Sequence, residues 1–74
     1  MNNFYKILRE LRQEKGILQN ELAQKIGYSQ ASVSDWENEV KQPTADTLIA
    51  VARFFDVSTD YLLGLEDENG YKIP

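Results

Sequence analysis

The sequence predicts an all-α fold built from five short helices. Apolar residues recur at spacings of three and four along most of the chain, which is the period of an amphipathic helix. Glycine, serine or threonine separates these stretches, at the places where helices end or begin. No stretch shows the alternation of apolar and polar residues that indicates a strand. We therefore expect a cluster of packed helices without a sheet.

The first two helices are predicted over Asn3 to Lys15 and Gln19 to Ile26. Gly16 and Gly27 end them, because glycine readily adopts the left-handed conformation that closes a helix. The expected inward residues are Phe4, Ile7, Leu8 and Leu11 in the first helix and Leu22, Ala23 and Ile26 in the second.

The remaining helices each follow a hydroxyl residue that can cap a helix N-terminus, namely Ser29, Thr44 and Ser58. The third helix is predicted over Gln30 to Asn38, and the short fifth helix ends near Gly64. The expected inward residues are Val33 and Trp36 in the third helix and Leu48, Val51, Ala52 and Phe55 in the fourth.

The chain divides into one folded domain, residues 1–64, and an acidic C-terminal segment, residues 65–74. The segment contains Glu66-Asp67-Glu68 and the turn signal Asn69-Gly70. We expect a mobile tail or a short appendage there. The acidic cluster lacks the ligand spacing of a calcium loop, so no metal site is expected.

Composition narrows the function classes. The 74 residues include no cysteine and no histidine, so no nucleophile–base pair can be drawn, and neither catalysis nor a cofactor is expected. No secretory signal or membrane-spanning run is present, which predicts a cytoplasmic protein without a membrane partner. The net charge of −4 disfavours a generic nucleic-acid binder. Whether the chain binds nucleic acid therefore depends on where its charges lie.

The third helix has an outer face of small and polar side chains. At 100° per residue, burial of Val33 and Trp36 turns the opposite face outward. Such a face on an arbitrary helix is usually only solvated. Here the preceding helix and turn leave it prominent, which suits entry into a DNA major groove. Glutamine there can bond to adenine, an alanine methyl can contact thymine, and aspartate can accept from the cytosine amino group. The outward residues are Gln30, Ala31, Ser34, Asp35 and Asn38.

From Ile7 to Gly64 the sequence resembles the lambda-repressor-like, or Xre-type, helix-turn-helix regulators. The resemblance implies a five-helix domain with its helix-turn-helix at the second and third helices. It also implies binding to operator DNA as a homodimer, in the role of a transcriptional regulator that acts as a repressor. The matching pieces, in order, include Leu8-Arg9-Glu-Leu-Arg12, Glu21-Leu-Ala23, Gly27-Tyr-Ser29, Trp36-Glu37-Asn38 and Asp60-Tyr-Leu-Leu-Gly64.

The resemblance also implies roles for single residues. Base contacts fall to Gln30, Ala31, Ser34 and Asp35, and backbone contacts fall to Gln19, Ser32, Asn38 and Lys41. Arg12 and Glu37 are expected to form an ion pair between the first and third helices. Lys6, Arg9 and Lys25 are expected on a solvated face, from which Lys25 could reach a phosphate.

Three residues depart from the family pattern. Leu18 replaces the usual Ser or Thr cap of the second helix, which removes about 1 kcal/mol of capping energy. Glu39 replaces a glycine after the third helix, and Asp35 stands where Lys or Gln is common. Their two carboxylates near the DNA surface would weaken binding and make it salt-sensitive.

Two functions remain open. The first is sequence-specific binding to double-stranded DNA by a homodimer, with a possible subunit interface at Phe54 and Tyr61. The second is a protein-interaction module that keeps the fold and has lost DNA affinity, which the acidic balance favours.

Overall fold

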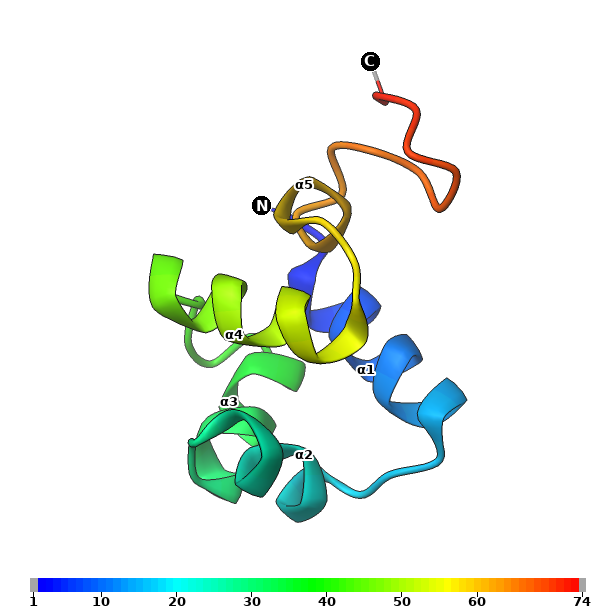
Figure 1. Cartoon of the computed structure of the whole chain (residues 1–74). Helices are drawn as coiled ribbons and strands as arrows, with labels where there is room; N and C mark the ends of the chain where they lie inside the picture. The colour runs from blue at the N-terminus through cyan, green and yellow to red at the C-terminus, as the bar shows by residue number, and fades with distance from the viewer. Residues whose placement is uncertain (1, 74) are drawn as a thin grey trace.

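The computed structural model describes residues 2–73 and contains the five predicted helices (Figure 1). Among these residues there is no strand, and one isolated antiparallel β-bridge joins Glu66 to Lys72. The all-α prediction is therefore confirmed. The helices are α1 (Phe4–Lys15), α2 (Gln19–Ile26), α3 (Gln30–Glu37), α4 (Ala45–Phe55) and α5 (Thr59–Leu62).

Local capping sets most of the helix ends. The hydroxyls of Ser29, Thr44 and Ser58 each accept a hydrogen bond from the backbone N–H three residues later, at 3.1, 3.2 and 3.0 Å. Gly16 and Gly27 end α1 and α2 with φ of 72° and 81°, a region that side chains with a Cβ avoid. The predicted caps and stops are therefore confirmed.

Three details at helix ends differ from or add to the prediction. Asn3 is the N-cap of α1 rather than its first residue, and Asn38 is the C-cap of α3 rather than its last residue. Leu18 has no side-chain acceptor to cap α2, as expected. The Glu21 carboxylate partly compensates, because it accepts a hydrogen bond from the Leu18 N–H at 2.9 Å. One half of a capping box therefore remains.

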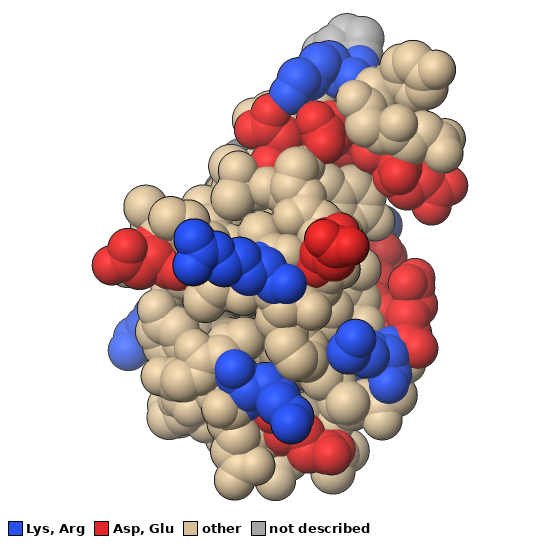
Figure 2. Space-filling view, in the orientation of Figure 1, with Lys and Arg blue, Asp and Glu red and all other residues tan. Residues whose placement is uncertain are grey.

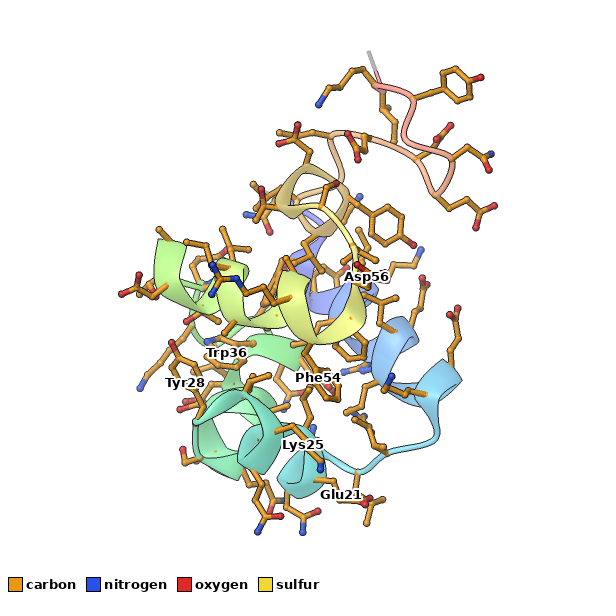
Figure 3. All side chains as sticks on the ribbon, in the orientation of Figure 1. Glu21, Lys25, Tyr28, Trp36, Phe54 and Asp56 are labelled. Atoms are coloured by element: carbon orange, nitrogen blue, oxygen red, sulfur yellow. The ribbon has the colours of Figure 1, made fainter. Side chains whose placement is uncertain are left out.

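The core brings together apolar side chains from all five helices, and Trp36 is part of it. Its ring packs edge-on against Phe4 and Tyr28, with ring centroids 6.4 and 5.1 Å apart, and Figure 3 shows Tyr28 beside Trp36. Edge-to-face aromatic pairs are favourable beyond the area that they bury. The buried apolar residues are Phe4, Leu8, Leu22, Ala23, Val33, Trp36, Val51, Ala52 and Leu62.

The inward face of α4 includes one residue that the apolar pattern does not predict. Thr47 is 2% exposed, and its hydroxyl donates a hydrogen bond to the Tyr28 hydroxyl at 3.2 Å. The predicted inward residues Leu48 and Phe55 are only half-buried, at the edge of the core. The hydrogen bond between Thr47 and Tyr28 satisfies a hydroxyl group that would otherwise be costly to bury.

The C-terminal segment, residues 65–73, folds back on itself and is therefore an appendage. Backbone hydrogen bonds join Asp67 N–H to Tyr71 O at 2.8 Å and Ile73 N–H to Leu65 O at 2.9 Å. Lys72 holds the segment to the domain through an ion pair with Asp60, and it forms a second ion pair with Glu66 within the segment. In Figure 1 the segment lies at the opposite end of the molecule from α2 and α3.

Candidate nucleic-acid interface

The outer face of α3 lies open, opposite its buried side. Val33 and Trp36 are 0% and 5% exposed, so they fix the orientation of the helix. The structure leaves Gln30 and Ala31 exposed and Ser32, Ser34 and Asp35 half-exposed. The Asn38 amide donates a hydrogen bond to the Ser34 hydroxyl at 3.2 Å. The face therefore offers small donors and acceptors from the start of α3 to its last turn.

The Glu37 carboxylate is buried at the end of α3, and Arg12 neutralises it. Arg12 donates from Nε to Oε2 at 2.6 Å and from Nη2 to Oε1 at 2.9 Å. The two side chains are 13% and 1% exposed. The hydrogen bond to Glu37 raises the pKa of Arg12, and burial opposes this effect. The predicted ion pair between α1 and α3 is present with bidentate geometry, which is the stronger form of such a pair.

Gln19 belongs to the same network. Its Nε2 donates a hydrogen bond to Glu37 Oε1 at 3.1 Å. The first residue of α2 is thereby held against the last residue of α3. This contact orients the amide that the resemblance assigns to a DNA phosphate.

Arg9 is exposed, as predicted, and it also contacts the end of α3. Its Nη2 donates to the backbone carbonyl of Glu37 at 2.9 Å, and its Nε lies 3.7 Å from Glu37 Oε1. Arg9 thus donates to one of the last carbonyls of α3, which lack partners within the helix. Its positive charge also interacts favourably with the negative C-terminal end of the helix dipole. The spacing contained a signal, because Arg9 lies three residues before Arg12 and shares its side of the helix.

The loop after α3 folds back onto the helix. The Asp35 carbonyl accepts hydrogen bonds from Val40 N–H at 2.8 Å and Lys41 N–H at 3.3 Å. Lys41 Nζ consequently lies 3.7 Å from Asp35 Oδ2, with side chains 71% and 31% exposed. The sequence placed Lys41 among the phosphate contacts and did not predict its pairing with Asp35.

Glu39 occupies the position where the family usually has glycine, and it adopts the conformation that glycine favours. Its φ is 58°, in the left-handed region, and its side chain is exposed. A non-glycine residue is strained there by about 1–2 kcal/mol. The strain and the exposed carboxylate both lie in the loop that directly follows α3.

Charge is unevenly distributed over the molecule. Lys25 is exposed on α2, and Figure 3 shows it on the same side of that helix as Glu21. Figure 2 shows acidic side chains gathered around the C-terminal segment, whereas most basic side chains on this face are spread over the helices. The end that carries α2 and α3 is acidic as well, because residues 19–41 include four acidic and two basic residues.

The two aromatic residues considered for a subunit interface are both half-buried. Phe54 packs edge-on against Phe55 with centroids 4.9 Å apart, and Lys15 Nζ lies 5.2 Å from the Phe54 ring centroid. Larger exposed apolar surface lies at residues that the sequence reasoning did not consider for this role. These are Leu18, Val40, Ile49, Leu65, Tyr71 and Ile73.

Two other kinds of site are absent from residues 2–73. No group of three or more carboxylate residues is arranged to hold a metal ion. No helix within this range has the length and apolar character needed to cross a membrane.

Comparisons with known proteins agree with this geometry. The helix-turn-helix family model matches residues 8–62. The chain is 42% identical over 66 residues to YobD of Bacillus subtilis, named an uncharacterized HTH-type transcriptional regulator, covering 89% of this chain and 59% of YobD. It is 39% identical over 62 residues to the HTH-type transcriptional regulator ImmR of Bacillus subtilis, covering 84% of this chain and 49% of ImmR. The chain thus spans only about half the length of these relatives.

Solved structures show the same arrangement of helices. The P22 c2 repressor in complex with a synthetic operator aligns with a TM-score of 0.77 and 30% identity, covering 81% of this chain and 91% of that one. The N-terminal DNA-binding domain of SinR from Bacillus subtilis aligns with a TM-score of 0.78 and 28% identity, covering 89% and 94%. The chain belongs to the helix-turn-helix family of lambda-repressor-like, or Xre-type, regulators.

Proposed function

We propose that this chain binds double-stranded operator DNA in a sequence-specific manner and regulates transcription, most simply as a repressor. The observation that carries the proposal is the open outer face of α3, whose opposite side is fixed by buried Val33 and Trp36. An α-helix presented in this way fits a major groove. The solved repressor relative, whose structure was determined with a synthetic operator, supports the same mode of binding.

The proposed contacts divide into two sets. Gln30, Ala31, Ser34 and Asp35 face the base edges, because they line the outer face of α3. The contacts to the sugar-phosphate backbone come from residues at the margins of that face, namely Gln19, Ser32, Asn38, Lys41 and Lys25. The hydrogen bond from Gln19 Nε2 to Glu37 fixes the orientation of the Gln19 side chain for this role.

The pairing of charges explains how an acidic protein could approach DNA. Arg12 neutralises Glu37, and Lys41 lies beside Asp35, so Glu39 is left as the exposed carboxylate next to α3. Few cations remain for phosphates. We therefore expect modest affinity that falls as salt rises, because each phosphate contact releases counterions.

We further propose that residues 1–64 are the DNA-binding unit, that residues 65–74 are an accessory segment, and that two copies bind two half-sites. Half-sites one helical turn apart, about 34 Å, would suit a two-fold dimer. Phe54 and Tyr61 are the candidate interface residues, since both keep part of their rings exposed. A role at operator DNA places the protein in the cytoplasm. Binding rather than catalysis is its activity.

The decisive experiment is selection of bound sequences from a random duplex library at low salt, using the whole chain. The proposal predicts an enriched motif with two-fold symmetry. The matched control is Ala31→Glu, which places a carboxylate on the exposed outer face near the start of α3. This control should keep its helical circular dichroism and lose the motif. A library that stays random with the unaltered chain would refute DNA recognition.

A protein-interaction module is the second candidate, and the exposed Glu39 carboxylate favours it. The double variant Asp35→Lys, Glu39→Gly separates the two functions. Binding by the variant alone would mean that the parent chain has lost the DNA-binding role. Binding by both, with higher affinity in the variant, would support the first proposal.

A further inference from the structure

Asp35 and Lys41 form a paired donor and acceptor at the surface that would face DNA. The carboxylate is on α3 and the ammonium group is in the following loop, 3.7 Å apart. Two backbone hydrogen bonds to the Asp35 carbonyl, from Val40 and Lys41, hold that loop against the last turns of the helix. The ammonium group therefore lies beside the carboxylate because the backbone brings it there.

The chemistry of this pair matches one base pair. In the major groove, cytosine presents an amino donor, and the guanine opposite presents the acceptors O6 and N7. An ionised carboxylate can only accept hydrogen bonds and an ammonium group can only donate them. Asp35 thus complements cytosine, and Lys41 complements the guanine paired with it. An A·T pair also presents an amino donor beside an acceptor, but thymine offers the ammonium group one acceptor, O4, where guanine offers two, O6 and N7.

We propose that Asp35 and Lys41 together read a single C·G base pair in each half-site. This inference rests on the proposed DNA-binding function and assigns part of its specificity. It changes the role of Lys41 from a phosphate contact to a base contact. It also removes the electrostatic objection to Asp35, because the pair carries no net charge as it approaches the phosphates.

The test measures base preference position by position, by selection and by competition binding with substituted duplexes. The unaltered chain should prefer C·G at one position of each half-site by about tenfold, the scale of a good two-bond contact. Asp35→Ala and Lys41→Gln should each reduce the preference at that position towards parity. The double variant should resemble either single variant there, because the two residues act as one unit. Asp35→Asn should additionally accept A·T, since an amide can bond to adenine.

Lys25→Gln is the matched control, because it removes an exposed cation that has no ion-pair partner among residues 2–73. Loss of a phosphate contact weakens binding to all sequences alike and lowers the salt slope by about one. If Lys41→Gln behaves like Lys25→Gln and keeps the C·G preference, the proposed reader is wrong, although the DNA-binding function stands. If the unaltered chain selects a motif with no C·G position sensitive to Asp35, the reader is also wrong. If it selects no motif, the proposed function fails and the inference falls with it.

Discussion

Arg12 binds both carboxylate oxygens of Glu37, at 2.6 and 2.9 Å, and so joins α1 to the last residue of α3. Glu37 is also the acceptor for Gln19 and, through its carbonyl, for Arg9. One buried carboxylate therefore sets the position of α3 relative to both α1 and α2.

The first prediction concerns the removal of Arg12. Arg12→Met should lower the free energy of unfolding by about 3 kcal/mol, because it leaves the buried Glu37 charge poorly compensated. The double variant Arg12→Met, Glu37→Met should recover much of the loss, since it removes both charges. Urea denaturation followed by the fluorescence of Trp36, the single tryptophan, measures both. Lys6→Met, at an exposed position of α1, is the control and should change little. An equal loss in the single and double variants would contradict the electrostatic explanation.

The second prediction concerns the strained position after α3. Glu39→Gly should raise the melting temperature by about 4 °C, because relief of left-handed strain is worth about 1 kcal/mol in a domain of this size. It should also strengthen DNA binding. Glu39→Gln separates the two effects, since it removes the charge and keeps the strain at φ 58°. Glu39→Gln should bind DNA more tightly than the unaltered chain and should have the same melting temperature. Calorimetry measures the melting temperatures, and titration with DNA at one salt concentration measures the affinities. Equal melting temperatures for the unaltered chain and both variants would refute the strain argument.

The third prediction concerns the titration of Tyr61. Burial raises its pKa, and the nearby carboxylates of Glu14, Glu68 and Glu10 raise it further. The unfolded chain loses this proton at about pH 10, before the folded chain does. Stability that is complete below pH 10 should therefore be lost as pH rises through the higher pKa of the folded state. NMR titration of labelled tyrosine rings measures the pKa directly. Glu14→Gln should bring it down, and Tyr61→Phe should reduce the alkaline loss of stability. A Tyr61 pKa equal to that in an unfolded peptide would contradict this.

The fourth prediction concerns the C-terminal segment. Lys72→Met should increase the motion of residues 66–73 on the nanosecond scale, because it removes the ion pairs to Asp60 and Glu66. The global unfolding transition should stay unchanged, since none of these residues is in the buried core. Heteronuclear NOE measurements report the motion.

Hydrogen bonding to Asp60, then to Glu66, raises the pKa of Lys72, so the unaltered segment should stay ordered until the pH passes that raised value. A segment equally ordered in both proteins would show that its backbone hydrogen bonds suffice.

The features that the sequence predicted correctly depend on neighbouring residues. Ser29, Thr44 and Ser58 act within one helical turn, and Gly16 and Gly27 act on their own backbone, so short patterns reveal them. The Arg12–Glu37 pair spans 25 residues, and only the resemblance to a family indicated it.

The features that the sequence did not predict depend on residues that are distant or oriented by a loop. The burial of Thr47 requires the hydroxyl of Tyr28, 19 residues earlier. The pairing of Lys41 with Asp35 requires a loop that turns back onto α3. No local pattern encodes either contact, because the first depends on how α4 packs against the rest of the domain and the second on the path of the loop after α3.

The placement of charge at the two ends of the molecule has a consequence for diffusion. Carboxylates gather around the C-terminal segment (Figure 2), and that segment lies at the end opposite α2 and α3 (Figure 1). The opposite end is acidic too, because residues 19–41 carry four acidic and two basic residues. Since a polyanion repels both ends of a molecule whose net charge is −4, long-range electrostatics slows the encounter with DNA, and binding depends on short-range contacts.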